Sequence, residues 1–503
     1  GRAPCTILPS QAGDRRLPHT REHPTMTLTH ILVFIVAAAL YLALIPARWR
    51  GWALLAGSVV AIYWLQPPIR IRSLDFVFPT ATLILAALGW AITRAPGQRW
   101  TRDDTAAALV VAGLVIALAL GRYLAPELRV TPTRPPGLLN VGLALGAGGA
   151  LLVALGRGGR APRRLIVPAM LAILALFVVL KTGPLAESAA RLLRQAAGQS
   201  PDLASAAELE WLGFSYVAFR LIHTLRDRQT GKLPPLTLRE YLTYAIFFPA
   251  YTAGPIDRAE RFAPDLRDLP GPDPARLTQG GARIAVGIAK KFIIADSLAL
   301  FALNPTTAAQ AESGGALWVL LYAYTFQLYF DFSGYTDIAI GLGQLYGIRL
   351  PENFNRPYLR RNLTLFWQSW HITLSQWVRF YVFSPLSRYL LTRRRKPSPL
   401  VLALVGQVAT MVAIGLWHGV SGHFVVWGVW HGLGLFAHKL WSDRTRALYL
   451  ALRERPRAAR ALEIAGVIVT FHYVALGWVW FALPDLGVGW DVMARLLLPA
   501  ALR

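Results

Sequence analysis

The chain has 503 residues, of which 54% are hydrophobic and 16% are charged, and its mean hydropathy is +0.41. These values lie outside the range of soluble globular proteins and within that of integral membrane proteins. The net charge of +25 does not indicate a nucleic-acid ligand, because all but six of the 52 basic residues are arginines and many of them fall in short loops between apolar segments, as the positive-inside rule expects.

Apolar segments long enough to cross the hydrocarbon core of a bilayer recur along the whole chain. The clear ones are residues 31–46, 51–66, 76–93, 105–121, 137–156, 165–180, 281–303, 315–332, 399–417, 422–440 and 462–482. Shorter or more polar segments, compatible with spans, re-entrant helices or interfacial helices, lie at 205–223, 240–254, 335–347 and 363–386. We therefore predict an all-α, polytopic membrane protein with about 11–13 transmembrane or re-entrant helices.

The N-terminal 25 residues differ from the rest of the chain. Residues 1–25 are polar, rich in proline and without helical periodicity, so we predict an unstructured leader upstream of the true start at Met26. The apolar segment after Met26 has no A-x-A cleavage site and is expected to be an anchor. The only cysteine, Cys5, lies in the leader, so the rest of the chain contains no disulfide, thiolate metal site or cysteine nucleophile.

The two halves of the chain differ in polarity. Residues 26–200 are predicted to be a transmembrane scaffold, in which 184–199 form an amphipathic helix that lies on a membrane surface or caps the core. Residues 201–445 also carry His, Asp, Asn, Gln and Trp and are interrupted by Gly and Pro. A membrane tolerates such residues only where they are buried in protein or line a wet cavity. This region is predicted to hold the functional site, and 446–503 to form C-terminal transmembrane helices.

Two carboxylates stand out in the apolar segment 328–348. Asp331 and Asp337 are six residues apart, or about 120° around a helix, so they do not share a face. Residues 333–334, Ser-Gly, predict a break between two short helices that meet inside the membrane. The simplest role of the two carboxylates is capping or ion pairing, and a direct catalytic role is the alternative. The expected ion-pair partners are arginines such as Arg356, Arg360 and Arg361.

Residues 351–383 start with a turn rich in Pro and Asn and continue as an amphipathic, aromatic helix. Its large aromatic side chains would lie at an interface, and His371 points elsewhere. A single histidine on such a helix is usually a hydrogen-bonded core residue, so the residues alone leave its role open.

Four further histidines lie between residues 415 and 438, at His418, His423, His431 and His438. Their spacings of 5, 8 and 7 differ from the i,i+3 or i,i+4 of helical metal sites, and no carboxylate is interleaved, so a metal is not expected. Glycines on both sides of His418 predict a bend that turns this imidazole toward a cavity. The other three are predicted to make structural hydrogen bonds. A buried neutral imidazole is a suitable general base for activating a hydroxyl.

Several motifs, in this order, resemble the core of the membrane-bound O-acyltransferase (MBOAT) family, and most closely its bacterial polysaccharide branch. They are SYVAFRLIH (215–223), FFPAYTAGPIDRAERF (247–262), GIAKKFIIAD (287–296), YFDFSGYTDIAIGLG (329–343), PENFNRPYLRRNLTLFWQSWHITLSQWVRFYVF (351–383), GLWHG (415–419) and VWHGLGL (429–435). The resemblance covers roughly residues 205–445. It identifies 201–445 as an MBOAT-like catalytic core.

The resemblance implies a helical bowl with a central tunnel, in which a thioester donor from the cytoplasm meets an extracytoplasmic hydroxyl. It implies that His418 is the catalytic histidine and that His371 fills the second catalytic position. Further candidates to line the tunnel or to orient the reacting groups and stabilise an oxyanion are Asn355, Gln368, Ser375, Trp417, Asp331 and Asp337. The basic candidates to bind an anionic donor, or anionic lipid headgroups instead, are Arg356, Arg360, Arg361, Arg393, Arg394 and Arg395.

The implied reaction moves an acetyl or D-alanyl group from acyl-CoA or an acyl carrier protein to a cell-envelope polysaccharide. No cofactor is expected to stay bound. The expected partners are the lipid bilayer, the donor, the polysaccharide and an extracytoplasmic partner acyltransferase, but no nucleic acid. The expected location is the bacterial cytoplasmic membrane, with several passes.

Two other functions are compatible with the sequence. The first is acylation of a lipid or protein by the same chemistry. The second is a proton-coupled transporter, in which the intramembrane Asp and His residues relay protons. The sequence shows no inverted repeat of the kind common in secondary transporters, and its histidines gather in one half, which favours the enzyme.

Overall fold

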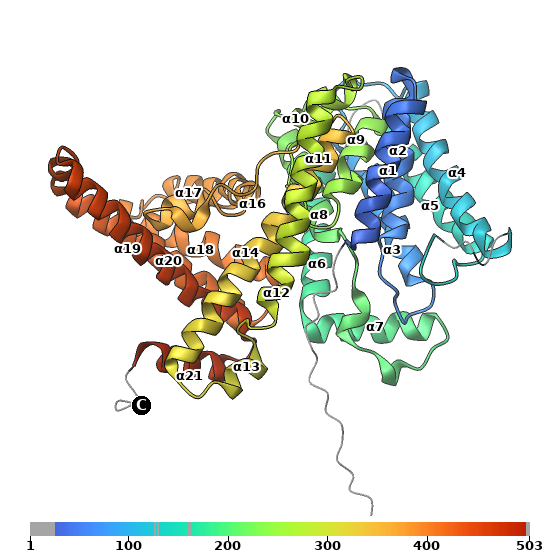
Figure 1. Cartoon of the computed structure of the whole chain (residues 1–503). Helices are drawn as coiled ribbons and strands as arrows, with labels where there is room; N and C mark the ends of the chain where they lie inside the picture. Colours follow the sequence, from blue (N-terminus) through green and yellow to red (C-terminus); the bar gives the residue numbers. More distant parts are fainter. Residues whose placement is uncertain (1–25, 125–126, 128–129, 158–162, 499–503) are drawn as a thin grey trace, which may run out of the picture.

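A computed structural model describes residues 26–124, 127, 130–157 and 163–498 of the chain. The predicted leader at 1–25, with Cys5, lies outside the described residues. Within them all regular elements are helical and no strand is present (Figure 1). The prediction of an all-α fold is confirmed for this part of the chain.

The N-terminal helices gather on one side of the molecule, on the right in Figure 1. Trp90 on α3 donates from its indole nitrogen to the Leu236 carbonyl oxygen at 2.8 Å, which ties this group to the second half of the chain. The elements are α1 (Leu28–Leu44), α2 (Ala47–Trp64), α3 (Leu74–Thr93), α4 (Arg102–Leu124), α5 (Leu138–Arg157), η1 (Arg163–Leu165), α6 (Ile166–Lys181) and α7 (Gly183–Ala196).

Helix α7 caps the core, one of the two roles predicted for residues 184–199. The chain bends by 95° between α6 and α7, so α7 lies across the lower end of its neighbours (Figure 1). Its buried face carries Ala186 and Ala190, which pack with Ile71 and Phe78. Leu185 and Leu192 are exposed on the same helix, as expected for an amphipathic segment.

The second half begins with short helices and continues with long ones. Its first elements are η2 (Pro201–Leu203), η3 (Ala206–Leu209), α8 (Phe214–Gln229), α9 (Leu238–Ile246), η4 (Phe248–Ala250), α10 (Ala259–Arg267), α11 (Pro274–Ile288), the π-helical η5 (Ala289–Ala295), α12 (Asp296–Ala299) and α13 (Pro305–Gln310). The later elements are α14 (Gly314–Leu345), η6 (Pro357–Leu359), α15 (Leu363–Trp367), α16 (Ile372–Val378), the π-helical η7 (Arg379–Phe383), α17 (Ser384–Leu391), α18 (Pro399–His418), α19 (Gly422–Arg453), α20 (Pro456–Ala482) and α21 (Leu486–Leu497). Helix α19 continues through the predicted domain boundary at residue 445.

Helix α14 crosses the middle of the molecule beside α11, between the N-terminal helices and α16–α21 (Figure 1). The predicted break at residues 333–334 is wrong, because α14 is one continuous helix of 32 residues. Gly334 serves close packing instead. A Cβ atom at this position would lie 2.8 Å from the carbonyl oxygen of Gly287, so the two helix backbones touch only because both residues lack a side chain.

Asp331 and Asp337 form ion pairs with basic residues of the α11–η5 segment. Asp331 pairs with Lys291, and Asp337 pairs with Lys290 at 2.7 Å and with Arg283 at 3.0 Å. Ion pairing was the simplest role predicted for both carboxylates. The predicted partners Arg356, Arg360 and Arg361 were wrong, because α11 lies against α14 and brings its own cations to the two aspartates.

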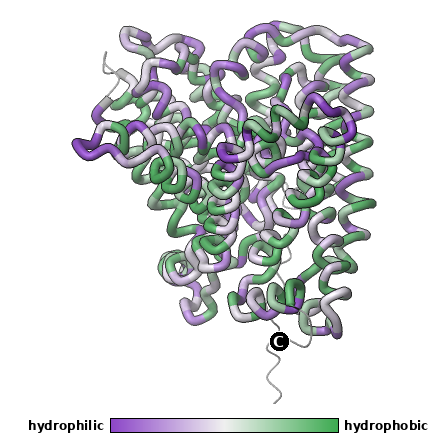
Figure 2. The backbone as a smooth tube through the Cα atoms, turned by 90° about the vertical axis from the view of Figure 1, so that its left-hand side faces the viewer, coloured by the Kyte–Doolittle hydropathy of each residue, from purple (hydrophilic) through white to green (hydrophobic). Residues whose placement is uncertain are grey.

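Five of the described helices are long and apolar enough to cross a membrane, or six if the bent pair α6–α7 counts as one span. Figure 2 shows hydrophobic residues along upright helices and many hydrophilic stretches at their ends and loops, as expected for a multi-pass membrane protein. The number is below the predicted 11–13 because some apolar segments form short or interrupted helices and others lie in helices that are long but not apolar enough, such as α14 and α19. Residues 281–303, for example, are divided among α11, η5 and α12. The five helices are α3, α4, α5, α18 and α20.

Candidate active site

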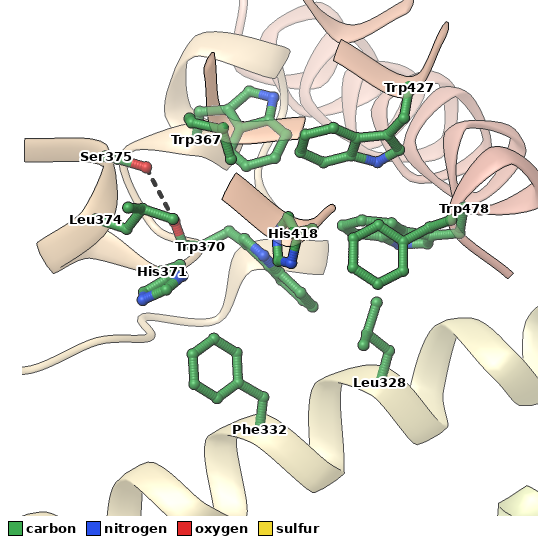
Figure 3. Close-up of a pocket in the computed structure, with 12 residues that line it drawn as sticks. Leu328, Phe332, Trp367, Trp370, His371, Leu374, Ser375, His418, Trp427 and Trp478 are labelled. Atoms are coloured by element: carbon green, nitrogen blue, oxygen red, sulfur yellow. Dashed lines mark hydrogen bonds between the residues drawn. The ribbon is translucent and has the colours of Figure 1, made fainter. Parts of the chain in front are cut away.

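A cavity lies where α14, α15, α16, α18, α19 and α20 converge (Figure 3). Its volume is about 40 Å³. His371, His418 and Ser375 are the polar side chains in its lining, which contains no charged side chain. The full lining is Leu328, Phe332, Trp367, Trp370, His371, Leu374, Ser375, Ile414, His418, Trp427, Trp478 and Phe481.

His371 reaches the cavity from the residue that precedes α16. Its backbone is left-handed, with φ at 43° and ψ at 56°, a conformation that costs a residue other than glycine about 1–3 kcal/mol. Its ring packs edge-on against Phe332 with the ring centroids 4.7 Å apart. Nε2 is buried and has no hydrogen-bond partner in the described part of the chain. A strained backbone beside an unused buried nitrogen is typical of a functional residue.

Asn353 holds the first turn of α16 in place. Its backbone oxygen accepts a hydrogen bond from the Ile372 amide at 2.9 Å. Its side-chain Oδ1 accepts two more from Thr373, from the backbone amide at 3.2 Å and from Oγ1 at 2.9 Å. The Asn353 side chain is fully buried. These three bonds fix the two residues after His371, and so they offset the cost of its strained backbone.

His418 is the last residue of α18, and α19 starts at Gly422. The corner between the two helices needs glycine at position 415, because a Cβ atom there would collide with the backbone oxygen of Phe424. The predicted bend is therefore confirmed. The imidazole lies between Trp417 and Phe481, with ring centroids 4.4 Å and 4.7 Å away, and the residue is partly exposed.

The structure brings two of the predicted tunnel residues to the histidines. Ser375 lines the cavity, where its Oγ donates to the Trp370 carbonyl oxygen at 3.3 Å. Trp417 packs against His418 and also against His371, at a centroid distance of 5.8 Å from the latter. Asn355 and Gln368 are exposed and do not line this cavity. The tunnel positions Asp331 and Asp337 are likewise absent from its lining and belong to the ion pairs of α14.

A second, polar cavity of about 520 Å³ lies on the other side of α15. Gln368 lines it and directly follows Trp367, which lines the first cavity, so a single turn of chain separates the two. Arg361 is 3.7 Å from Glu463, and Lys439 bonds to Asp443 at 2.6 Å. The lining consists of Arg361, Asn362, Thr364, Leu365, Gln368, Gln407, His438, Lys439, Ser442 and Asp443.

The other predicted donor-binding arginines line neither cavity. Arg360 donates to the Asn355 carbonyl oxygen at 2.7 Å, and Arg356 is exposed beside it. Residues 393–395, all arginine, are exposed in the loop between α17 and α18, where Arg393 stacks on Tyr389. Of the six predicted residues, the structure therefore places Arg361 alone in a cavity.

Residues 170–477 match the membrane-bound O-acyltransferase (MBOAT) family. This match covers more than half of the chain and includes the cavity lining except Trp478 and Phe481. The chain belongs to the MBOAT family. The resemblance inferred from the sequence motifs is confirmed, and the protein is placed among acyltransferases.

The MBOAT protein is similar to acyltransferases of several envelope polymers. Teichoic acid D-alanyltransferase of Streptococcus thermophilus is 33% identical over 289 residues, which are 54% of this chain and 68% of the relative. Probable alginate O-acetylase AlgI of Pseudomonas aeruginosa is 36% identical over 290 residues, 56% of this chain and 50% of the relative. Peptidoglycan O-acetyltransferase of Helicobacter pylori is 34% identical over 276 residues, 52% of this chain and 49% of the relative. The chain spans about half the length of the two O-acetylating relatives.

The three remaining histidines of α19 differ in how well they are bonded. His423 Nδ1 lies 2.9 Å from the Trp480 carbonyl oxygen, and His438 Nδ1 lies 3.1 Å from the Thr364 hydroxyl, as predicted for structural histidines. The prediction was wrong for His431, which is fully buried and has no hydrogen-bond partner at either ring nitrogen among the described residues. Its ring instead packs among aromatic side chains, including Trp427 at 4.9 Å.

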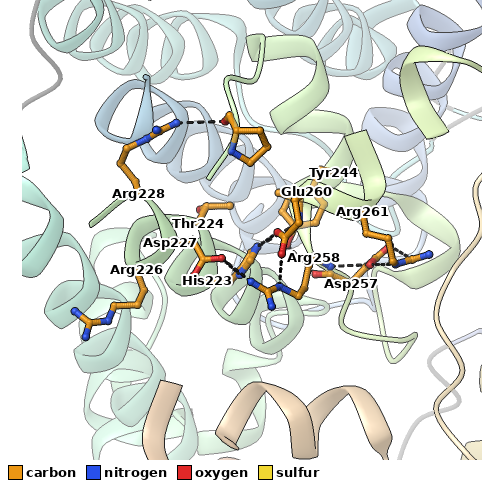
Figure 4. A network of polar contacts seen from close by, with 12 residues as sticks. His223, Thr224, Arg226, Asp227, Arg228, Tyr244, Asp257, Arg258, Glu260 and Arg261 are labelled. Atoms are coloured by element: carbon orange, nitrogen blue, oxygen red, sulfur yellow. Dashed lines mark hydrogen bonds and ion pairs between the residues drawn. The ribbon is translucent and has the colours of Figure 1, made fainter. Parts of the chain in front are cut away.

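A second histidine cluster lies outside the cavity in this MBOAT protein, between α8, the start of α10 and η7 (Figure 4). Ligand atoms of His223, Asp227 and Glu260 lie within 4.8 Å of one another, a spacing that suits a metal ion. Most of these ligand atoms already have partners among the described residues, however, and Glu260 Oε2 is the exception. His223 bonds to the Tyr381 hydroxyl at 2.6 Å, and Arg258 donates to Asp227 at 2.8 Å and pairs with Glu260 at 2.6 Å. The Arg258 guanidinium provides the positive charge that a metal would bring.

Sequence reasoning missed two sets of residues that shape the cavity. Asn353 was overlooked in favour of Asn355, although both belong to the same PENFN motif. The aromatic wall formed by Trp427, Trp478 and Phe481 was also missed. Trp427 lies on α19 and the other two lie on α20, and no local motif connects them, so only the packing of the two helices reveals that the three rings meet.

Proposed function

We propose that this MBOAT protein transfers a small acyl group, of the acetyl or D-alanyl type, from a thioester donor to a hydroxyl of a cell-envelope polysaccharide. The observation that carries the proposal is the cavity in which His418 and His371 meet within an uncharged lining. The two imidazoles come from different elements, α18 and the turn before α16. Neither lies within an ion pair of the described residues, so both are available for proton transfer and hydrogen bonding with a substrate.

In the proposed reaction His418 is the general base. A ring nitrogen of this residue takes the proton of the acceptor hydroxyl as the oxygen attacks the thioester carbonyl carbon. The tetrahedral intermediate then collapses, the C–S bond breaks, and the imidazolium returns the proton to the leaving thiolate. The products are an oxygen ester and a thiol. Transfer from a thioester to an oxygen ester is downhill, so the step needs no other energy source.

The negative charge that develops on the carbonyl oxygen requires hydrogen-bond donors. Nε2 of His371 is suited to this role in the tautomer that carries its proton there, because it is buried, has no partner among the described residues and belongs to a residue that lines the cavity. We assign His371 to this stabilising role, in support of the base His418.

We place the polar part of the donor in the second cavity. This cavity lies toward the end of α19 that carries Arg444 and Arg446, a basic end that the positive-inside rule assigns to the cytoplasm. Arg361 and Lys439 in its lining suit the phosphates of acyl-CoA or of the phosphopantetheine arm of an acyl carrier protein. The exposed arginines at 393–395 suit the acidic surface of a carrier protein or anionic lipid headgroups.

The acceptor is inferred from the relatives, whose names specify teichoic acid, alginate and peptidoglycan. A polymer of this kind lies outside the cytoplasm. We therefore propose that the protein works in the bacterial cytoplasmic membrane, takes its donor from the cytoplasm, and presents the acyl group to the polysaccharide or to an extracytoplasmic partner acyltransferase.

The test is a comparison of ester-linked acyl groups in cells that contain the wild type, His418→Ala or His472→Ala in place of the native protein. His472 is a matched control because it lies on α20 and lines neither cavity. Loss of the general base is expected to lower the ester content of the envelope polysaccharide about 10²–10⁴-fold, whereas His472→Ala leaves it unchanged. If esters are lost from the lipid or protein fraction alone, the acceptor is not a polysaccharide. If no ester depends on His418, the proposed reaction is wrong.

A further inference from the structure

Three aromatic rings close one side of the cavity around His418. The centroids of Trp427 and Trp478 are 6.0 Å apart, and Phe481 lies 5.8 Å from the first and 5.5 Å from the second. His418 contacts this wall, at 4.7 Å from Phe481 and 5.9 Å from Trp427. In Figure 3 Trp427 and Trp478 lie on the opposite side of His418 from His371. An acyl group whose carbonyl carbon is placed between the two histidines therefore directs its tail at these rings.

The wall is held firmly. Trp427 and Trp478 are each 1% exposed. The indole nitrogen of Trp478 donates to the Tyr358 hydroxyl at 3.2 Å, and Trp427 packs against Trp367 at 5.6 Å. Closely packed interiors resist the shift of several rings at once. The space beside His418 is therefore limited by these side chains and does not expand freely to fit a longer group.

The volume of this space indicates a very short acyl group. A group the size of a water molecule needs roughly 10–15 Å³ of such volume, so a cavity of about 40 Å³ holds three or four non-hydrogen atoms. An acetyl group contains three, a butyryl group five, and a D-alanyl group five.

The chemical nature of the lining excludes a charged tail. No carboxylate or other charged side chain is among the described residues that line the cavity. The ammonium of a D-alanyl group would lose its water shell here and find no counter-ion in the lining. Aromatic faces attract an ammonium, but the gain is smaller than the cost of removing an unpaired charge from water. An uncharged methyl group, in contrast, matches an aromatic wall.

We infer that Trp427, Trp478 and Phe481 restrict the acyl group transferred at His418 to two uncharged carbons, as in an acetyl ester. The inference rests on the proposed acyl transfer and adds the residues that set its specificity. Phe481 is the most direct test because it touches His418 and is less buried than the two tryptophans. Its replacement by alanine opens the wall by most of a phenyl ring.

The native gene is deleted, and the cells then produce either the wild type or a variant from an introduced gene. Membranes from these cells are supplied separately with acetyl-CoA, propionyl-CoA and butyryl-CoA. The ester formed on the envelope polysaccharide is measured by mass spectrometry, and alkali-released D-alanine is measured in the same cells. One methylene in an apolar pocket changes discrimination about 10–200-fold. We expect the wild type to favour acetyl over butyryl at least about 100-fold, and Phe481→Ala to reduce this ratio to below about 10-fold.

Phe471→Ala is the matched control, because it removes the same ring from α20 at a site outside both cavities and should keep the wild-type ratio. Equal use of acetyl and butyryl donors by the wild type would overturn the inference without any variant. His418-dependent release of D-alanine would also overturn it, while the proposed acyl transfer would stand. If the wild type forms no His418-dependent ester with any acyl group, both the inference and the proposed function fail.

Discussion

The molecule contains two groups of side chains built around histidine, and they differ in how fully their polar atoms are used. Around His223, the ring nitrogens and the carboxylate of Asp227 are bonded to Tyr381, the Ala259 amide and Arg258. Around His418 and His371 the neighbours are mainly aromatic rings, and Nε2 of His371 has no partner among the described residues (Figures 3 and 4). The first group is a structural clamp, and the second is a site with unused hydrogen-bonding capacity.

The comparison indicates that unused hydrogen-bonding capacity, and not the number of charged groups, marks the reactive site of this membrane protein. The cluster at His223 contains more charges and even the spacing of a metal site. Nevertheless, most of its buried polar atoms already have partners, and in the described part of the chain Glu260 Oε2 and Arg258 Nε are the cluster atoms without a hydrogen bond. Little hydrogen-bonding capacity is therefore left for a substrate. The clamp also has a structural task. Through Tyr381 it fixes η7, the continuation of the helix that begins beside His371. The cluster thus supports the cavity from outside.

If the cavity is the reactive site, the largest effect on ester formation is expected at Asn353, which positions the turn that carries His371. Asn353→Ala removes both side-chain hydrogen bonds to Thr373. A shift of His371 by about 1 Å is expected to lower ester formation about 100-fold. Asn355→Ala, two residues away at an exposed position, should leave activity within about twofold. Equal activity of the two variants, measured as polysaccharide ester at matched protein levels, would contradict the positioning role.

The general fold and the place of His418 at a bend could be predicted because their signals are local, whereas the role of His371 was predicted from the resemblance to the family motifs. Apolar periodicity indicates helices, and the glycines around His418 indicate a corner in the chain. The roles of Asn353 and Asn355 could not be separated in this way. The two asparagines lie in the same turn, and which of them is buried depends on how that turn packs against α16.

Features that depend on contacts between distant segments of the chain could not be predicted from the sequence either. Lys290 and Lys291 are about 40–47 residues away from the aspartates that they bind. Gly334 is similar: a glycine inside an apolar run indicates either a helix break or a close helix contact, and the choice depends on Gly287 on another helix. The sequence alone shows neither partner.

A smaller effect is expected in the clamp, where stability and not chemistry should change. Arg258→Ala leaves the buried Asp227 carboxylate without its cation. Loss of a partner from a buried charged group costs about 2 kcal/mol, so the thermal unfolding midpoint should fall while the acetyl-to-butyryl ratio of the remaining activity stays constant. Arg226→Ala is the control, because Arg226 lies on α8 but points away from the cluster (Figure 4). A changed donor preference in Arg258→Ala would show that the cluster takes part in substrate selection.

The smallest effect on stability is expected at a buried ion pair between Arg194 on α7 and Glu208 in η3. Arg194 Nε donates to Glu208 at 2.8 Å, and this hydrogen bond lowers the pKa of the Glu208 carboxyl below its usual value. A carboxyl whose pKa is lower in the folded state adds stability above its unfolded pKa, and this stability is lost as the pH falls through the folded value. The unfolding midpoint of the wild type should therefore fall more between pH 7 and pH 3 than that of Glu208→Gln, which has no carboxyl to protonate.

The control is Glu187→Gln, at the exposed pair with Arg191 on the same helix. Its unfolding midpoint should depend on pH as in the wild type, because exposed pairs contribute little to stability. If the unfolding midpoint of Glu208→Gln also falls with pH as much as that of the wild type, the ion pair between Arg194 and Glu208 does not hold α7 against the core.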